Sequence, residues 1–462
     1  MTTRAQHSVK QLVTHLKPHG DEIISFLALR KKGGDVYPGV EKAPVYFIND
    51  GKLPRGLTAE ALLKTGMLAV GVGAGDLDEH TMIDGVRVKP RDCSFTLTAK
   101  VLGLDTDPML KPLLEEVYHC DQSDKVWPTQ LPTLIKVRYS QNPDKEGEYK
   151  KMYMVIEWAT TAYDALWETG AEQIATTVDP TGLSDIYERL AVSQGWDKAP
   201  AESHKGKAYL ATKEMVKDSE SRSDMYLTEL AHLRKVLIKS GFAGVDNWVA
   251  FVLIDMYNKN VKHWETVDEI NTKGVFRDVQ INNHSGGLTM LYIESDSQQV
   301  SSAARSGSGG YVGVVIQRNS AGNTMISLNR NDKLVRERRL SIDTLVSMVR
   351  TAEAIKRRIP LANLPPFEKL CVQGSVPSLE MWYRHEDMLL NGSTTTPNVA
   401  RSLLTKEELC DIVRCSLNKV LTANWRCEYG DRIPHNQSYV KAGNTSNIAM
   451  LEKMVDKAFA GK

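Results

Sequence analysis

The stretch VKQLVTHLKPHGDEIISFLALRKK, residues 9–32, decides the fold of the N-terminal part of the chain. Its apolar and β-branched start predicts a strand from Val9 to His15. From Asp21 to Lys32 apolar residues recur at helical spacing, which predicts a helix. The loop between them gathers two imidazoles and two carboxylates within eight residues: His15, His19, Asp21 and Glu22. A strand that enters a helix through a short polar loop is typical of an α/β protein with a parallel sheet.

The same alternation of short apolar runs and helical patterns continues up to residue 135. We expect Thr58 to be the N-cap of a short helix. The expected strands are residues 45–48 and 67–72, and the expected helices are residues 58–64, 94–104 and 108–119. These elements predict an N-terminal parallel-sheet domain, residues 1–135.

Two more regions follow this domain. Residues 136–275 are predominantly helical in pattern, and the turn-forming segment at residues 140–147 marks a loop near their start. Residues 276–462 combine helical stretches with strand signals at 288–295, 311–317 and 324–329. The expected fold class is α/β: an N-terminal parallel-sheet domain, a helical insert or linker and a C-terminal mixed α/β domain.

The composition is that of an ordinary globular protein, with 462 residues, 42% apolar and 25% charged residues and a net charge of +1. This balance gives no general attraction for a polyanion, so affinity for nucleic acid must come from local patches. Six cysteines without a Cys-x-x-Cys pair argue against a disulfide scaffold or a structural zinc site. With no signal sequence and no long apolar run, we expect a cytoplasmic protein without membrane contact. The sequence leaves open whether the chain forms a homo-oligomer.

Polar side chains also follow the strand expected at residues 67–72. The loop at residues 73–80 adds three carboxylates and another imidazole: Asp76, Asp78, Glu79 and His80. Because the carboxyl ends of parallel strands border one ligand crevice, we expect this loop to face residues 15–22. A third cluster, which contains His119 and Asp121, follows an apolar helix.

Carboxylates gathered this closely repel one another unless a cation neutralises them. Mixed Asp and His ligands suit Mn²⁺ or another divalent transition metal, and two such ions can promote phosphoryl chemistry by activating water. Asp78 and His80 are the candidate catalytic residues, with His80 as proton donor to the leaving oxygen when it is not a ligand. The expected metal ligands are His15, His19, Asp21, Asp76, His80 and Asp121.

Each cluster also has a purely structural interpretation. Asp21 is a suitable N-cap residue beside ordinary loop histidines, and the acidic loop at residues 76–79 is also typical of a solvated turn. The polar residues around Asp121 are common at the end of a buried helix. The glycines of GVGAGD, residues 71–76, lack the spacing of a dinucleotide-binding loop, and the nearby carboxylates would repel pyrophosphate. This excludes a nicotinamide cofactor.

The order of these motifs resembles the DHH phosphoesterase superfamily, most nearly its branch of metal-dependent nucleases. The resemblance covers residues 10–125 and rests on Thr14-His15, His19-Gly20-Asp21-Glu22, Asp78-Glu79-His80 in the place of Asp-His-His, and Cys93-Ser94 before a helix. It implies a metal-dependent phosphohydrolase, either a nuclease or a nucleotide phosphodiesterase, whose substrate is nucleic acid or a nucleotide.

Two departures from the family's pattern fall within the expected site. Gly73 stands where the family has an aspartate, and Glu79 replaces one histidine of the triplet. They leave open an altered metal preference, a single-metal site or a degenerate enzyme. The alternative function is therefore a DHH-like scaffold that serves as a nucleic-acid or protein interaction module. A third is a structural assembly protein built on the helical middle region.

The C-terminal region is loosely similar to the substrate-binding domain of such proteins. Its glycine-rich turns expose backbone N–H groups, and an arginine can pair with phosphate oxygens. We therefore expect four residues to bind substrate: His284, Gly309, Gly310 and Arg318. A flexible hairpin loop is the alternative. The segment from Trp382 to Ser393 predicts a hairpin whose aromatic and basic groups are exposed for base stacking.

Overall fold

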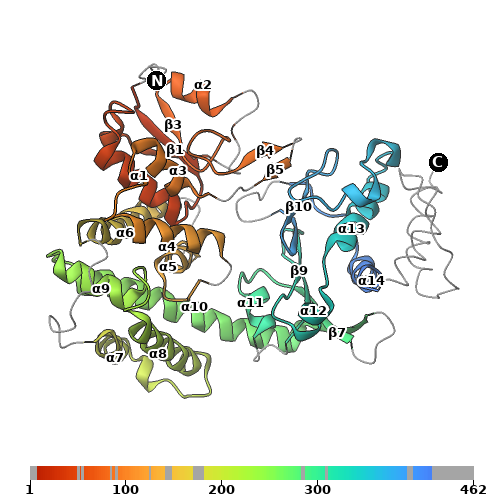
Figure 1. The fold of residues 1–462 in the computed structure, drawn as a ribbon. Coiled ribbons are helices and arrows are strands. Elements are labelled where there is room, and N and C mark those ends of the chain that lie inside the picture. The colour runs from red at the N-terminus through yellow and green to blue at the C-terminus, as the bar shows by residue number, and fades with distance from the viewer. Residues whose placement is uncertain are drawn as a thin grey trace, which may run out of the picture. The chain divides into compact units, whose positions relative to one another are not determined.

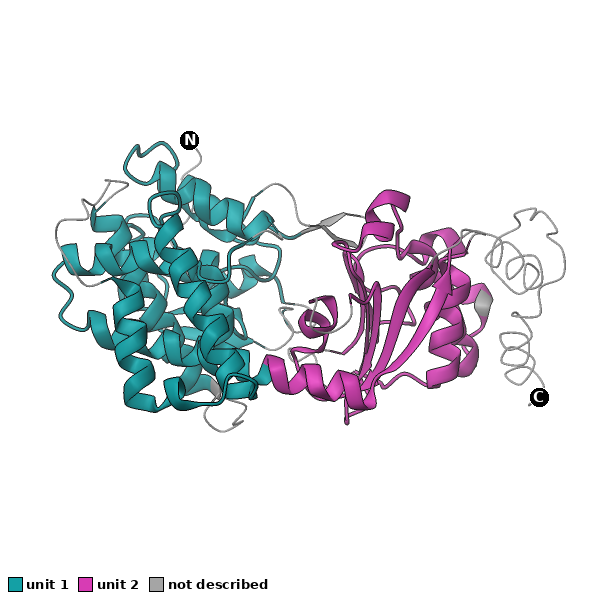
Figure 2. Ribbon diagram, turned by 90° about the horizontal axis from the view of Figure 1, so that it is seen from below, with its two compact units in different colours: residues 1–83, 88–262 teal, residues 84–87, 263–462 magenta. Residues whose placement is uncertain are grey.

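The computed structural model (Figure 1) describes residues 8–48, 53, 57–83, 86–88, 92–123, 126–140, 148–169, 182–281, 287–306, 311–392 and 399–418. They form an α/β protein with two compact units, coloured separately in Figure 2: residues 1–83 with 88–262, and residues 84–87 with 263–462. The α/β class expected from the sequence is confirmed. The first unit contains both the expected N-terminal domain and most of the expected helical region.

A three-stranded parallel sheet lies at the start of the first unit. Strand β1 (Gln11–His15) is central, between β2 (Val45–Ile48) and β3 (Met67–Ala69). In this register His15 is opposite Ile48, and Val13 is opposite Ala69. The expected strand at residues 45–48 is confirmed. Strand β3 ends three residues earlier than expected, because Gly71 and Gly73 adopt positive φ values of 67° and 84° that extended backbone cannot continue.

Helix α1 (Gly20–Lys32) is the central helix of this unit, and every residue from Gly20 to Leu29 is buried. A helix buried on all sides must find partners for its polar side chains, which here include Asp21 and Glu22 in its first turn. The helices α2 (Ala59–Lys64), α3 (Ser94–Leu102) and α4 (Lys111–Gln122) follow. Thr58 caps α2 by accepting the N–H of Ala61, as expected. Two short strands that the sequence did not predict are β4 (Thr81–Ile83) and β5 (Val86–Val88).

The rest of the first unit is helical, as expected from the sequence. Its elements are α5 (Leu131–Ser140), α6 (Glu148–Thr169), α7 (Leu183–Gln194), α8 (His204–Arg222), α9 (Leu230–Lys239), a 3-10 turn at Trp196–Lys198 and α10 (Val245–Lys273), which continues into the second unit from residue 263. A further 3-10 turn, Val40–Lys42, precedes β2. Trp158 of α6 and Trp248 of α10 stack with ring centroids 4.6 Å apart. Each indole N–H donates to the other residue's carbonyl, at 3.2 and 2.9 Å.

A buried connection joins the expected N-terminal and helical regions into one unit. Gln130 and Glu229 form an antiparallel bridge, flanked by a hydrogen bond from the Leu131 N–H to the Thr228 carbonyl, 2.8 Å. The Glu116 carboxylate in α4 accepts the N–H groups of Leu227 and Thr228 at 2.7 and 2.8 Å. The border expected at residue 135 therefore lies inside a packed unit.

The second unit is built on a six-stranded sheet in the order β10-β11-β9-β8-β7-β6. Its neighbouring strands are antiparallel except β7 and β8, which are parallel and connected through α11 (Val300–Arg305). The strands are β6 (Val275–Gln280), β7 (Gly287–Glu294), β8 (Val314–Arg318), β9 (Thr324–Leu328), β10 (Trp382–His385) and β11 (Met388–Asn391). The helices that complete the unit are α12 (Lys333–Arg338), α13 (Asp343–Lys356) and α14 (Lys406–Ser416), with 3-10 turns at Leu361–Asn363 and Phe367–Lys369.

Both faces of this sheet are covered. Successive side chains of β7 point to opposite faces, so this strand contributes to two separate hydrophobic cores. Met290 and Tyr292 belong to one cluster, which also contains residues of α13 and α14. Leu291 and Ile293 point to the other face and pack with α11 and the end of α10. The near-continuous apolar run LTMLYI is therefore that of a strand buried on both sides.

Candidate metal centre

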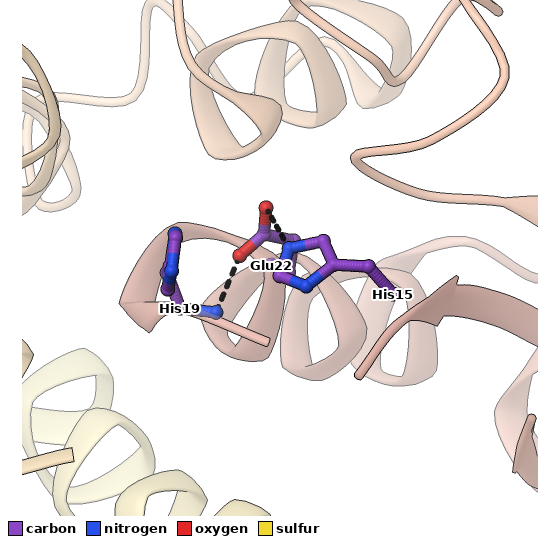
Figure 3. Close-up of side chains that lie close together, drawn as sticks. All are labelled: His15, His19 and Glu22. Atoms are coloured by element: carbon purple, nitrogen blue, oxygen red, sulfur yellow. Dashed lines mark hydrogen bonds and ion pairs between the residues drawn. The ribbon is translucent and has the colours of Figure 1, made fainter. Parts of the chain in front are cut away.

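The end of β1 and the start of α1 bring two histidines and a glutamate together (Figure 3). Figure 3 shows the imidazole of His15 and the carboxylate of Glu22 pointing toward each other, with 3.2 Å between Nε2 and Oε1. The other Glu22 oxygen accepts the backbone N–H of His19 at 2.6 Å. The His15 and His19 rings lie edge to face, with centroids 5.2 Å apart. Ligand atoms from these three residues lie within 4.8 Å of one another.

The hydrogen bonds of His15 fix which ring nitrogen faces the site. Nδ1 lies 2.8 Å from the Leu16 carbonyl, which can only accept, so Nδ1 carries a proton. Nε2 then faces Glu22 and donates to its carboxylate, so that a metal ion bound at Nε2 would replace this proton. Metal-binding histidines are commonly oriented in this way, with one nitrogen bonded to a carbonyl and the other directed at the ion.

Glu22 is stabilised as a carboxylate although it is buried. Burial alone would raise the pKa of Glu22, but the charges of His15 and His19 and the hydrogen bonds from both residues outweigh it. The pKa of this carboxyl therefore lies well below its ordinary value. A buried anion at the end of a parallel strand is suited to hold a cation.

The loop after β3 supplies a second group, Asp78, Glu79 and His80, whose ligand atoms also lie within 4.8 Å of one another. Asp78 is buried and accepts the Ala74 N–H at 2.7 Å and the His80 N–H at 3.0 Å. The Nδ1 atom of His80 lies 3.0 Å from Asp78 and 3.2 Å from Glu79. Both carboxylates therefore orient this imidazole, which remains partly exposed.

Ser94, the first residue of α3, connects the two loops. Its backbone N–H donates to Asp21 Oδ2 at 3.2 Å, and its hydroxyl donates to Glu79 Oε2 at 2.9 Å. Because Asp21 precedes Glu22 in the buried first turn of α1, the two groups adjoin through Ser94. The expectation that the loops after β1 and β3 meet is confirmed by these contacts. The N-terminus of α3 also directs its partial positive charge at both carboxylates.

A third group consists of Asp21, Cys93 and Asp121, again with ligand atoms within 4.8 Å. Cys93 precedes Ser94 and is fully buried. Burial raises the pKa of the Cys93 thiol well above its ordinary value, and the nearby charges of Asp21 and Asp121 raise it further. Without a cation the thiol stays protonated, whereas a soft metal ion would favour the thiolate.

Three buried hydroxyls near these groups have no hydrogen-bond partner among the described residues: Thr14, Tyr139 and Tyr163. Thr14 precedes His15 in β1. Burial raises the pKa of both tyrosines. The charge of Glu22 raises that of Tyr139 further, and the charge of Asp21 does the same for Tyr163. The Tyr163 hydroxyl lies so close to Gly20 that a Cβ there would overlap it. Buried polar atoms are nearly always satisfied, so each of these hydroxyls can form a hydrogen bond with a group bound at the centre.

Most of the expected ligands are brought together, with one clear exception. Asp76 is exposed and belongs to none of the three groups found among the described residues. His15, His19, Asp21, Asp78, His80 and Asp121 each belong to a group. Three members of these groups were not among the expected ligands, although the sequence clusters or motifs contained them: Glu22, Glu79 and Cys93. For two of them the position in the sequence was the available signal. Glu22 lies in the first turn of a helix, and Cys93 immediately precedes another helix.

The residues expected to bind substrate in the C-terminal region have a different outcome. His284, Gly309 and Gly310 lie outside the described residues. The Arg318 guanidinium donates to the Thr324 hydroxyl at 3.1 Å and to the Leu404 carbonyl at 2.6 Å. It therefore connects segments of the second unit, and a phosphate would compete with these bonds.

The expected hairpin forms as β10 and β11, but its first aromatic residue is not exposed. Trp382 is fully buried, and its indole N–H donates to the buried Glu353 at 3.2 Å. This corrects the expectation of Trp382 as a base-stacking group. An alternating strand directs every second residue to the core, and here the core side includes Trp382.

Comparisons with protein-family models, with curated proteins and with solved structures find no match. Within the described part of the chain, no helix combines the length and apolar character needed to cross a bilayer.

Proposed function

We propose that the first unit is a divalent-metal-dependent phosphohydrolase, a nuclease or nucleotide phosphodiesterase, with its centre at the ends of β1 and β3. One observation carries this proposal. Four buried carboxylates, Asp21, Glu22, Asp78 and Glu79, gather with His15 and His80 around the starts of α1 and α3. Buried carboxylates in such a cluster are stable when a cation neutralises them.

The donor set suits Mn²⁺ or another divalent transition metal. His15, His19 and Glu22 offer two imidazoles and a carboxylate, and Nε2 of His15 is already oriented by its Nδ1 contact. Asp21 and Asp121 offer two further carboxylates in a second group, whose third member, Cys93, suits a softer ion than Mn²⁺. A bound divalent ion would supply activation of water and polarisation of the phosphoryl group.

The residues of the chain would contribute orientation and proton transfer. Asp78 holds Nδ1 of His80 at 3.0 Å, which leaves Nε2 as the atom that can give a proton to a leaving oxygen. Ser94 keeps the Asp21 and Glu79 carboxylates in place through two separate hydrogen bonds. Fixed positions of this kind reduce the reorganisation that a charged transition state requires.

The alternative function, a DHH-like scaffold that serves as an interaction module, is favoured by Gly73. A Cβ at this position would lie 2.6 Å from Leu53 Cδ1, and φ is 84°. An aspartate at this position would therefore be strained and would displace the Leu53 side chain. Glu79 favours the metal-dependent enzyme instead, because its carboxylate is buried within a group of candidate ligands.

The test is the metal content of the purified full chain, with a Mn²⁺ titration and cleavage of end-labelled single-stranded RNA and DNA in the same samples. His15→Ala, Asp21→Asn and Glu22→Gln should lose both metal and cleavage. His119→Ala is the matched control, because His119 is exposed and belongs to no group of candidate ligands among the described residues. Salt-sensitive oligonucleotide binding without metal or cleavage would instead establish the interaction module.

A further inference from the structure

Lys151 lies in the first turn of α6, and its ammonium group is buried without a hydrogen-bond partner among the described residues. Three cations and one carboxylate act on it most strongly: Arg138, Lys17, Lys262 and Asp255. An ammonium ion removed from water without a partner is costly, and neighbouring positive charges add to that cost.

The single carboxylate of this group is already engaged. Asp255 of α10 lies 3.0 Å from Nη1 of Arg138. Burial raises the pKa of Asp255 to about 6, although Arg138 and Lys151 both act to lower it. Asp255 is therefore bonded to Arg138 and not to the ammonium group of Lys151.

Arg138, whose charge acts on Lys151, is held by two aromatic rings as well as by Asp255. Its guanidinium lies 4.8 Å from the ring centroid of Trp158 and 5.7 Å from that of Phe251. Its Nε atom is also buried without a partner among the described residues. A planar guanidinium fixed between two rings keeps a donor edge available for an oxyanion at little entropic cost.

The helix on which Lys151 lies adds to the positive potential. α6 has 22 residues, and its N-terminus carries a partial positive charge that favours anions and disfavours a lysine in the first turn. Burial and the neighbouring cations lower the pKa of Lys151 to about 8, against the opposing effect of Asp255. An anion bound here would relieve each of these costs.

This basic group adjoins the candidate metal centre. Lys17 lies between His15 and His19, and its backbone N–H donates to the sulfur of Met152 at 3.3 Å. Met152 follows Lys151 in α6. The loop with two candidate ligands is thus attached to the turn that presents the buried ammonium group.

We propose that Lys151, Arg138, Lys17 and Lys262 form a phosphate-binding subsite that holds a second phosphate group of a polyphosphate or polynucleotide substrate. The buried ammonium group of Lys151 and the unpartnered Nε edge of Arg138 suit an oxyanion, and the guanidinium can pair with two of its oxygens. The identity of the substrate rests on the proposed function of the metal centre. The binding of phosphate to this subsite does not depend on that proposed function.

The test compares Lys151→Met with Lys150→Met in the full chain. Both lysines lie in the first turn of α6, but Lys150 is exposed. Methionine keeps the apolar stem and removes an unpartnered charge, so Lys151→Met should fold. Calorimetric titration with inorganic phosphate should show affinity at least about 10-fold weaker in Lys151→Met than in Lys150→Met. Equal affinity in the two variants would overturn the subsite.

Cleavage kinetics then identify where the bound phosphate comes from. With end-labelled single-stranded DNA, Lys151→Met should raise KM and keep kcat and metal content near those of Lys150→Met. Weakened phosphate binding with an unchanged KM would overturn the assignment to substrate and identify free phosphate as the ligand. If no variant cleaves, the proposed function fails, and the phosphate titration still decides the subsite.

Discussion

Gly71 packs directly against the carboxylate of Glu22, so that a Cβ at position 71 would lie 2.6 Å from Oε1. Gly71→Ala should therefore displace Glu22 and weaken metal binding. Its positive φ alone costs alanine about 1–2 kcal/mol, and the overlap adds to this cost. Gly103→Ala is the matched control, because Gly103 has φ 69° and nothing within 4 Å of an added Cβ. Urea denaturation and metal titration should show a larger loss for Gly71→Ala; equal losses would contradict the contact.

Ser94→Ala should destabilise the first unit, because it removes a donor from the buried Glu79 carboxylate and keeps the backbone N–H that serves Asp21. A lost hydrogen bond to a buried charged group costs about 1.5–3 kcal/mol in the free energy of unfolding. Ser25→Ala is the control, since the buried Ser25 hydroxyl donates to a backbone carbonyl of its own helix at 2.6 Å. Urea denaturation of both variants measures the difference. A Ser94→Ala variant as stable as Ser25→Ala would argue against the bond between Ser94 and Glu79.

Asp78 and Asp76 belong to one loop but should differ in their effect on cleavage. Asp78→Asn removes the carboxylate that orients His80 and should lower kcat by about 100-fold if His80 transfers a proton. Asp76 is exposed, so Asp76→Asn should leave kcat within about 2-fold, as surface substitutions usually do. Single-turnover cleavage of labelled DNA provides the measurement. Equal loss of activity in the two variants would mean that Asp76 is a metal ligand, as the sequence predicted.

The Tyr163 hydroxyl offers a test in which stability and activity move in opposite directions. Tyr163→Phe removes a buried hydroxyl that has no partner among the described residues and should leave stability unchanged or raise it by up to about 1 kcal/mol. Cleavage should fall by about 10-fold or more if this hydroxyl contacts the bound substrate or ion. Tyr187→Phe is the control, because its hydroxyl donates to the Tyr209 carbonyl at 2.9 Å and its loss should destabilise.

The phosphate-binding subsite should depend on pH through Lys151. Burial lowers its pKa to about 8, and the charges of Arg138 of α5, Asp255 and Lys262 of α10 and Lys17 of the β1–α1 loop also act on it. Sulfate, which keeps its charge throughout this range, should bind progressively more weakly as the pH rises through 8. Lys151→Met should not show this change. A calorimetric titration series between pH 7 and 9 measures it, and an equal decline in Lys151→Met would point to another group.

The same shift has a defined effect on stability. Because the pKa of Lys151 is lower in the folded chain than its ordinary value of 10.5, the unfolded chain binds more protons between pH 8 and 10.5. The stability of the wild type relative to Lys151→Met should therefore rise with pH in that window. A relative stability that falls there would mean that the charged lysine is favourably paired.

The sequence predicted the loops of the centre better than the individual ligands. Asp76 and Glu79 are three residues apart in one acidic turn, and Asp76 was expected as a ligand because Gly73 stands where the family has an aspartate. The turn is closed by hydrogen bonds from the Ala74 N–H to Asp78 and from the Gly71 N–H to the Leu77 carbonyl. That closure leaves Asp76 in solvent and buries Glu79, and neither bond has a signature in residue pattern.

The sequence pattern also could not predict the long-range contacts. Ser94 bonds to Asp21 and Glu79 across 73 and 15 residues, and periodicity carries no information about such pairs. Local signals did better: the β-branched and aromatic run at Val45–Ile48 and the cap at Thr58 were predicted because short-range physics determines them. The border at residue 135 could not be placed, because it depends on partners far along the chain.

The bonds between Glu116 and the segment Leu227–Thr228 have a consequence for synthesis of the chain. A protein emerges from the ribosome N-terminus first, so α4 leaves the exit tunnel long before residues 227 and 228, which lie 111 and 112 positions later in sequence. Until they arrive, Glu116 stays in water and the β-bridge of Gln130 has no second strand. The opening third of the chain is therefore a nascent segment that completes its fold late, and a fragment cut at residue 135 would lack its closing partner.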